Sequence, residues 1–117
     1  MQTKTFLEEF ENHLDSILQI VRAKNKDYSG EKDPFKNFRL VEEIGLCTVE
    51  QGILTRMLDK ISRIVNLVDK DPEVVDESIQ DTLKDLAAYS IILLVYLREK
   101  GTGLRQAVNT PSSGQKM

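Results

Sequence analysis

The chain has 117 residues, of which 40% are hydrophobic and 30% charged, a balance that excludes a disordered chain and indicates one soluble domain. Its net charge of −3 gives no overall attraction to a polyanion, so we expect no strong direct binding to nucleic acid. The single cysteine, Cys47, cannot form an internal disulfide, and the first residues lack the apolar run of a signal peptide. We therefore expect a cytoplasmic protein without a membrane span, since the apolar run at residues 91–97 is too short to cross a bilayer.

The first half of the chain carries signals for one long and one short helix. Apolar residues recur at spacings of three and four, which predicts an amphipathic helix over about residues 5–26. Asp33 followed by Pro34 is typical of a helix start and predicts a short helix over about residues 34–44, ending near Gly45.

A third helix follows the short one. Thr48 and Gln51 stand three residues apart, which is the pattern of a capping box, in which each residue bonds the backbone of the other. Apolar residues at helical spacing continue from there and predict a helix over about residues 48–69.

The last helix has a similar start signal. Asp71 and Pro72 repeat the pattern of a cap followed by proline and predict a helix over about residues 72–100. Gly101 and Gly103 are expected to end this helix, because glycine is common just beyond helix ends.

Together these elements predict an all-α fold, a small bundle of three long helices and one short helix. We expect a single domain over about residues 1–100, followed by a flexible tail at 101–117 that is rich in Gly, Ser, Thr and Pro. From Ile91 onward the last helix is apolar all round, so one side needs a covering from outside the chain. We therefore expect a homo-oligomer formed through the 88–97 face.

Charged residues form two stripes on the last two long helices. Acidic residues recur at steps of four on the last helix, at Glu77, Asp81 and Asp85. Basic residues recur on the preceding helix, at Arg56, Lys60 and Arg63. Because a short loop joins these helices, they should form an antiparallel hairpin in which the numbers of facing residues sum to about 145. This register predicts that Lys60 and Asp59 lie level with Asp85, and it places Arg63 level with Asp81.

The facing stripes have two interpretations. The first is a ladder of salt bridges between helices, each of which contributes about 0 to 1 kcal/mol when exposed. The second is a site for a cation and a phosphate, in which carboxylates hold Mg²⁺ and basic side chains neutralise the phosphate. In this second interpretation the metal ligands are Asp59, Glu77, Asp81 and Asp85, and the phosphate-binding residues are Arg56, Lys60 and Arg63.

The segment KNKDYSGEKDPFKNFR at residues 24–39 is rich in aromatic and basic residues. Tyr28 and Phe38 could stack on a nucleobase, with Asn37 reading its edge and a basic side chain such as Lys24 or Arg39 reaching phosphate. Phenylalanines one helical turn apart, such as Phe35 and Phe38, are more often core residues. The candidate substrate-binding residues in this segment are Lys24, Asp27, Tyr28, Asn37 and Phe38.

Three sequence blocks in order carry a resemblance to a known family. They are KNKDYSGEKDPFKNFR, VEQGILTRMLDKISRIVNL and DESIQDTLKDLAAYSIIL, and they lie within about residues 18–97. In these blocks the chain resembles the phage-associated nucleotide modification associated domain 1 family, small helical proteins met beside nucleotide-modification and DNA-modification enzymes. The resemblance implies a role in nucleotide metabolism and, for a phage-encoded protein, the cytoplasm of a bacterial host.

The blocks are more distantly similar to the all-α, MazG-like nucleoside triphosphate pyrophosphohydrolases. In that group acidic helices bind Mg²⁺, and water cleaves between the α and β phosphates. This similarity implies that Asp81 and Asp85 hold the metal. The chain departs from the pattern at Leu46 and Thr82, which stand where that group has glutamates.

The sequence thus favours a protein that binds a nucleoside phosphate, with Mg²⁺, and hydrolyses a triphosphate to monophosphate and pyrophosphate. The residues that carry this reaction would be Asp81, Asp85 and Lys60. Two alternatives stay open at this point. One is a non-catalytic module that sequesters nucleotide or accompanies DNA modification, and the other is a structural helical adaptor.

Overall fold

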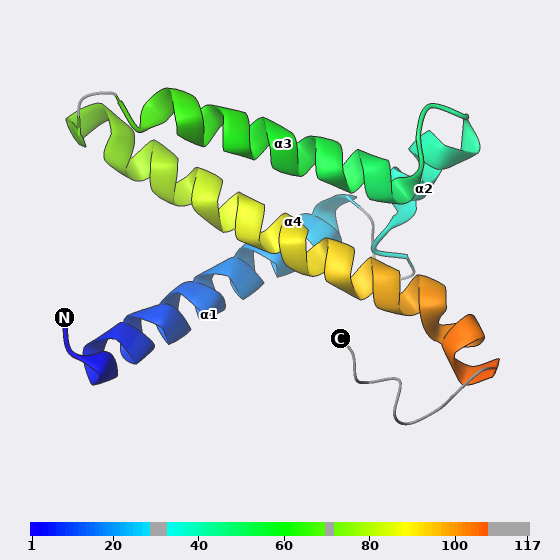
Figure 1. Cartoon of the computed structure of the whole chain (residues 1–117), viewed down its shortest axis with the longest axis horizontal. Helices are drawn as coiled ribbons and strands as arrows, with labels where there is room; N and C mark the ends of the chain where they lie inside the picture. Colours follow the sequence, from blue (N-terminus) through cyan, green and yellow to red (C-terminus); the bar gives the residue numbers. More distant parts are fainter. Residues whose placement is uncertain (29–32, 70–71, 108–117) are drawn as a thin grey trace.

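The structure, a computed structural model, describes residues 1–28, 33–69 and 72–107, and the side chains of residues 1–25, 33–69 and 78–101. The helices in these ranges are α1 (Thr3–Tyr28), α2 (Lys36–Glu43), α3 (Val49–Leu67) and α4 (Pro72–Ala107). The described ranges contain no strand. The predicted all-α fold with three long helices and one short helix is therefore confirmed (Figure 1). None of the helices in this part of the chain is long and apolar enough to cross a membrane.

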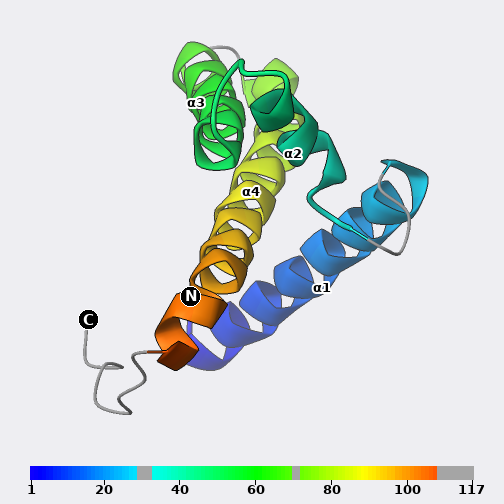
Figure 2. The same ribbon diagram turned by 90° about the vertical axis from the view of Figure 1, so that its right-hand side faces the viewer.

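The helices α3 and α4 form an antiparallel hairpin, and the other two helices pack against it. Figure 1 shows α3 and α4 side by side, with α1 crossing α4 near the middle of α4. Figure 2 shows that α1 and α2 lie on the same side of this hairpin. The fold is thus a two-helix layer with one covered side.

The start of α3 confirms the predicted capping box. The backbone N–H of Gln51 donates to the hydroxyl of Thr48 at 3.0 Å, and the side chain of Gln51 accepts from the backbone N–H of Thr48 at 3.0 Å. Two backbone donors that the helix leaves without a partner are thereby satisfied. Both of these bonds depend only on neighbouring residues.

The end of α2 depends on Gly45, as predicted. Gly45 has a φ of +83°, a left-handed conformation that residues with a Cβ rarely adopt. Its backbone N–H donates to the carbonyl of Glu42 and that of Leu46 donates to the carbonyl of Val41, both at 3.0 Å. This pair of bonds is a Schellman motif, which closes the helix and turns the chain toward α3.

The start of α2 lies slightly later than predicted. The helix begins at Lys36, and Pro34 belongs to the turn before it. The carboxylate of Asp33 accepts a hydrogen bond from the backbone N–H of Phe35 at 3.0 Å, so Asp33 caps this turn instead of the helix itself.

The end of α4 corrects the sequence prediction. Pro72 is the first residue of α4 as predicted, whereas Asp71 lies outside the described residues. The helix continues past Gly101 and Gly103 to Ala107, so the predicted stop at these glycines is wrong. Glycine in a helix costs about 1 kcal/mol relative to alanine, which a long helix tolerates because each added residue extends an existing structure. The flexible tail stays a prediction, since residues 108–117 lie outside the described ranges.

The core is small and lies where α2, α3 and α4 meet. Its buried members are Phe35, Val49, Ile53 and Tyr96, and both Val49 and Ile53 are 0% exposed. The rings of Phe35 and Tyr96 pack edge to face with centroids 5.2 Å apart, a favoured geometry for aromatic pairs. Ile17 of α1 and Ala88 of α4 are also buried, outside this core cluster.

The hairpin has two sides of different chemistry. The residues at the contact between α3 and α4 include Ile53, Met57 and Lys60 on α3. Helical spacing continues this series to Ile64 and Leu67, which are half-buried. In each helix of this antiparallel pair, one residue comes directly before each contact residue. These preceding residues lie on the same side of the hairpin in both helices. The reason is that two helices running in opposite directions, seen from the same end, turn their successive side chains in opposite senses. Residues one position after the contact residues share the other side.

The side of the hairpin that is formed by the residues preceding the contact residues is charged, and we call it the polar face. It comprises Arg56, Asp59 and Arg63 of α3 with Asp81 and Lys84 of α4. The helix α1 covers part of this side, since Lys84 donates a hydrogen bond to the hydroxyl of Ser16 at 3.2 Å. Near the start of α3, α2 covers the same side, because Phe38 lies 3.7 Å from the position of a Cβ on Gly52.

Candidate functional site

Asp85 of α4 lies between two lysines from two other helices. Its carboxylate is 3.3 Å from the ammonium of Lys60 on α3 and 3.6 Å from that of Lys24 on α1. We call these three residues the Asp85 cluster. The predicted register is confirmed at this level of the hairpin, because Lys60 and Asp85 are paired as expected.

Burial differs among the members of the Asp85 cluster. The side chains of Asp85 and Lys60 are 25% and 20% exposed, whereas that of Lys24 is 54% exposed. The pair between α3 and α4 is therefore partly shielded from water, and Lys24 reaches it from outside. Two ammonium groups face one carboxylate, so the cluster carries one positive charge in excess.

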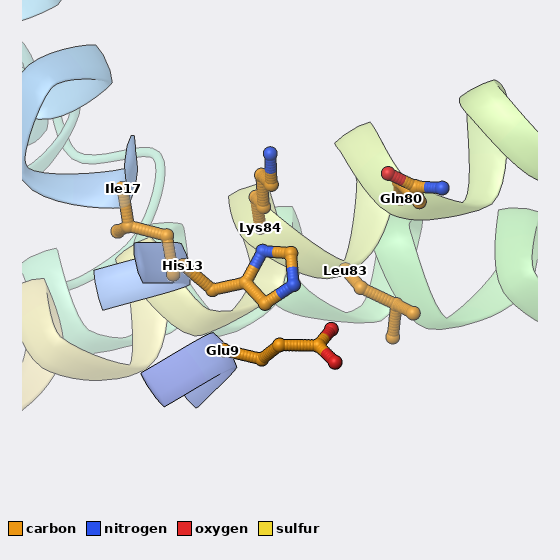
Figure 3. A pocket seen from close by; sticks show the side chains of 6 residues that line it. All are labelled: Glu9, His13, Ile17, Gln80, Leu83 and Lys84. Carbon is orange, nitrogen blue, oxygen red and sulfur yellow. The ribbon is translucent and has the colours of Figure 1, made fainter. Parts of the chain in front are cut away.

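A hollow of about 570 Å³ lies between α1 and α4 (Figure 3). It is lined by Glu9, His13 and Ile17 of α1 and by Gln80, Leu83 and Lys84 of α4. The volume falls within the range of about 300 to 1,000 Å³ that is usual for small-molecule sites. Lys84 borders the hollow and is the sequence neighbour of Asp85, whereas none of the three members of the Asp85 cluster lines the hollow.

The remaining charged candidates lie on the polar face without joining the Asp85 cluster. Arg56, Asp59, Arg63 and Asp81 are all exposed. Arg63 and Asp81, which the register places at one level, do not form an ion pair with each other in the structure. The structure therefore brings Lys24, Lys60 and Asp85 together and leaves these four side chains apart.

The metal ligands predicted from the sequence do not gather into a site among the described side chains. Within this part of the chain no three His, Cys, Asp or Glu residues lie close enough together to hold a metal ion. Asp85 is already paired with two lysines, and the side chain of Glu77 lies outside the described residues. The described donors therefore do not gather into a Mg²⁺ site, and the assignment of Asp59, Glu77, Asp81 and Asp85 to a metal stays a prediction.

The aromatic segment contributes to the core more than to an open site. Phe38 is half-buried and packs against the core cluster, and Asn37 is exposed on α2. The side chains of Asp27 and Tyr28 lie outside the described residues. The roles of these four residues in binding a substrate stay predictions.

Arg39 has partners that the sequence did not indicate. Its guanidinium lies 2.9 Å from Asp33, pairs with Glu99, and stands 5.7 Å from the ring centroids of both Phe35 and Tyr96. The hydrogen bond with Glu99 raises the pKa of Arg39 above its ordinary value. Arg39 therefore ties α2 to α4, and the phosphate contact expected of it stays a prediction.

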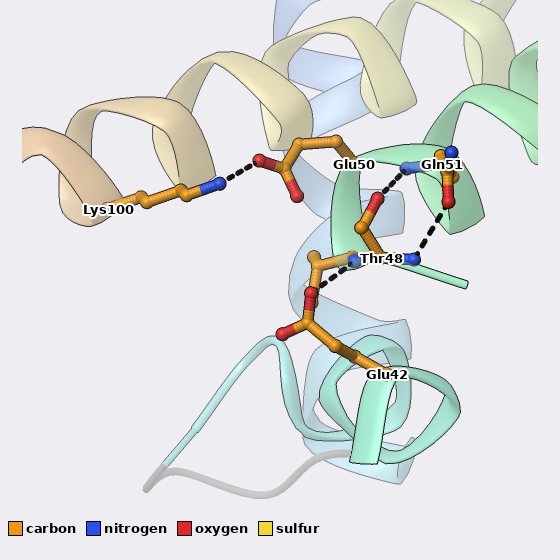
Figure 4. Close-up of polar contacts among 6 residues, drawn as sticks. Glu42, Thr48, Glu50, Gln51 and Lys100 are labelled. Carbon is orange, nitrogen blue, oxygen red and sulfur yellow. Dashed lines mark hydrogen bonds and ion pairs between the residues drawn. The ribbon is translucent and has the colours of Figure 1, made fainter. Parts of the chain in front are cut away.

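A second polar group lies where α2, α3 and the later part of α4 meet (Figure 4). Glu50 of α3 pairs with Lys100 of α4, and Glu42 of α2 accepts from the backbone N–H of Val49 at 3.2 Å. The hydrogen bond with Lys100 lowers the pKa of Glu50, and the same bond raises the pKa of Lys100. Burial raises the pKa of the neighbouring Tyr96.

Sequence reasoning missed the residues that α1 brings to the site. His13 is exposed, and it lines the hollow together with Glu9. Ser16 contacts Lys84 across 68 positions of sequence. Helical spacing places Glu9, His13 and Ser16 on one side of α1, but it does not indicate which helix they face. The predicted register, with a sum of about 145, places residue 95 opposite Glu50, so it did not indicate the pairing with Lys100.

Comparison with known proteins places the chain in a family. The family model described as Nucleotide modification associated domain 1 matches residues 24–97. This range begins at Lys24 and contains the whole Asp85 cluster, whereas the α1 residues that line the hollow precede it. No curated protein and no solved structure matches the chain. The likeness to the pyrophosphohydrolases stays a prediction, and the chain belongs to the Nucleotide modification associated domain 1 family.

Proposed function

We propose that this protein binds the phosphate groups of a nucleoside phosphate at the Asp85 cluster. The observation that carries the proposal is the convergence of Lys24 and Lys60, from two helices, on a single carboxylate. The excess positive charge lies within the region matched by a family associated with nucleotide modification. A phosphate with two negative charges would complement both ammonium groups better than Asp85 does alone.

The mode of binding follows from the exposure of the lysines. Lys24 is the most exposed member of the cluster, so it can leave Asp85 and turn to a ligand at small cost. Lys60 is held by its surroundings and offers a fixed ammonium group. The hollow between α1 and α4 offers room for the sugar and base, and Lys84 at its border provides a further positive charge.

The proposal stops at binding and includes no hydrolytic step. The described carboxylates do not fit a Mg²⁺ site, so we derive no cleavage of the bond between the α and β phosphates from them. Binding through ammonium groups needs no metal. We therefore expect retention of nucleotide in the presence of EDTA.

Titration calorimetry of the full chain with mono-, di- and triphosphate nucleosides tests this proposal. We expect Lys60→Ala and Lys24→Ala to weaken binding at least about tenfold, which corresponds to the loss of one charge-assisted hydrogen bond of roughly 1.5 to 3 kcal/mol. Lys4→Ala is the matched control, because Lys4 is an exposed lysine near the start of α1. Equal affinities of all three variants and the wild type would refute the assignment.

Incubation of the protein with deoxynucleoside triphosphates and Mg²⁺ tests the catalytic alternative. Release of monophosphate and pyrophosphate by the wild type, but not by Asp81→Ala, would support the pyrophosphohydrolase interpretation. It would also imply a metal site that includes residues beyond the described set. Tight binding without turnover supports the non-catalytic module.

Assembly is the second part of the proposal. The expected homo-oligomer through residues 88–97 is supported by the exposure of four large apolar side chains in that segment, Ile91, Leu94, Val95 and Leu97. These residues do not share one side of α4, because successive positions of a helix turn by about 100°. Which of them would pack against a partner depends on the side of the hairpin on which each lies.

A further inference from the structure

The side of the hairpin opposite the polar face is apolar, and we call it the open face. On α3 its residues each follow a contact residue, and they are Leu54, Leu58, Ile61, Val65 and Val68. On α4 the corresponding residues are Leu86, Ser90, Leu94 and Leu97, which follow Asp85, Tyr89, Leu93 and Tyr96. None of these nine positions carries a charge, and Ser90 is the one polar residue among them.

The open face is exposed in the single chain. Its five residues on α3 are 42% to 65% exposed, and Leu94 and Leu97 on α4 are 58% and 46% exposed. The helices α1 and α2 lie on the other side of the hairpin, as Figure 2 shows. Scattered exposed leucines are ordinary, whereas an aligned apolar surface two helices wide marks an interaction site.

The spacing on α3 is that of a helix packed on both sides. The contact residues Ile53, Met57, Lys60, Ile64 and Leu67 follow one another at steps of four and three. The open-face residues of α3 repeat the same steps one position later. Steps of four and three keep side chains on a seam along a helix, which is the pattern of helices packed in bundles. The sequence of α3 therefore provides a second seam of the same kind as the first.

We infer that the open face packs against the open face of a second copy of this chain, forming a four-helix bundle from two hairpins. A surface without charges is complementary to itself, and a two-fold axis allows the same residues to serve on both sides. Two hairpin layers packed face to face bury the apolar side of each, which is the arrangement that such layers require.

The area of the open face is sufficient for such an interface. At about 100 Å² for each of the seven half-exposed side chains, on the order of half of a large apolar side chain, each copy contributes about 700 Å². Two copies then bury about 1,400 Å², and stable interfaces bury about 1,200 to 2,000 Å². The last ten residues of the chain, VNTPSSGQKM, offer only Val108 and Met117 as large apolar residues, so they are a poor cover for this surface.

Exposed residues of the 88–97 segment lie on different sides of the hairpin, and only those on the open face are expected to pack against the second copy. Leu97 follows the buried Tyr96 and belongs to the open face, whereas Val95 precedes Tyr96 and points to the other side of the hairpin. The two residues are 46% and 50% exposed, so they differ in direction and hardly in exposure. The inference is independent of phosphate binding, which involves the polar face.

Sedimentation of the full chain over a range of concentrations tests the inference. We expect the wild type to sediment as a dimer of twice 13.3 kDa. Leu97→Glu and Leu58→Glu should raise the dissociation constant of the dimer at least about tenfold, because each buries an unpaired charge at the two-fold interface. Val95→Glu is the matched control and should remain a dimer.

A monomeric wild type, or a dimer broken by Val95→Glu and not by Leu97→Glu, would overturn the inference. Circular dichroism and a cooperative melt establish that each variant is folded. Should the glutamate variants fail to fold, Ile61→Cys and Val95→Cys in a Cys47→Ser background give a second measurement, because open-face cysteines near the axis should cross-link two copies on oxidation. Cross-linking at residue 95 and not at residue 61 would also overturn the inference. Nucleotide affinity is measured separately, so failure of one proposal leaves the other standing.

Discussion

The ammonium of Lys60 lies 3.3 Å from the carboxylate of Asp85, and this pair joins α3 to α4 beside the crossing of α1. The same carboxylate lies 3.6 Å from the ammonium of Lys24, so two lysines share one carboxylate. Two roles for Asp85 predict different results. If Asp85 held a metal ion, its carboxylate would be needed for nucleotide binding. If Asp85 is the partner of the two lysines, its carboxylate competes with phosphate for these lysines.

Asp85→Asn distinguishes these roles. We expect the variant to bind nucleoside phosphate about fivefold more tightly, because it removes one negative charge about 4 Å from the site, worth roughly 1 kcal/mol in water. Titration calorimetry in EDTA measures the change, with Asp15→Asn on the exposed side of α1 as the control. If Asp85→Asn loses nucleotide binding and added Mg²⁺ does not restore it, Asp85 does not act as a competitor of phosphate for the two lysines.

Glu50 gives the stability of the protein a dependence on pH. Its pKa is lowered from the ordinary 4.5 by the hydrogen bond with Lys100, so the pair stabilises the fold above pH 4.5. This stabilisation is lost as the pH falls through the lowered pKa, since the protonated acid no longer pairs with Lys100. Urea unfolding from neutral to acid pH should show that Glu50→Gln is less stable than the wild type at neutral pH. The difference should shrink toward low pH, and a constant difference would contradict this origin.

Thr48→Ala should destabilise the protein by about 1 kcal/mol, the usual cost of removing an N-cap side chain. The variant loses the hydrogen bond that the backbone of Gln51 donates to the hydroxyl of Thr48. Thr48→Ser keeps the hydroxyl and should stay close to the wild type. Urea unfolding measures both, and equal losses in the two variants would show that the hydroxyl is not the cause.

Ile53→Ala should cost about 2 to 5 kcal/mol, because the side chain is 0% exposed and its removal leaves a cavity between α3, α2 and α4. Ile44→Ala is the matched control, since Ile44 is 61% exposed and belongs to neither the polar face nor the open face. The control should change stability by less than about 0.5 kcal/mol. Similar losses in both variants would mean that the core does not lie where the structure places it.

The parts of the fold that depend on neighbouring residues were predictable from the sequence. Thr48 and Gln51 meet within one helical turn, and Gly45 acts through its own backbone conformation. The pairing of Lys60 with Asp85 was predictable for a related reason. A short connection between two long helices fixes their register, so counting residues is sufficient.

The parts that depend on the placement of α1 were not predictable. Ser16 meets Lys84 only because α1 crosses α4 at that level, and nothing in the local pattern of either helix indicates the crossing. Arg39 likewise finds Glu99 at a distance of 60 positions. The helix end predicted at Gly101 was wrong for a different reason. Glycine is a local signal for a helix end, but here the long helix α4 continues through it.

The opposite directions of the polar face and the open face have a consequence for what an assembled pair could recognise. Two hairpins joined through their open faces carry their Asp85 clusters on outward surfaces that point away from each other. Such a pair is bivalent. A partner that displays two phosphate groups at the matching span would gain affinity from simultaneous engagement, although each site alone binds no more tightly than before.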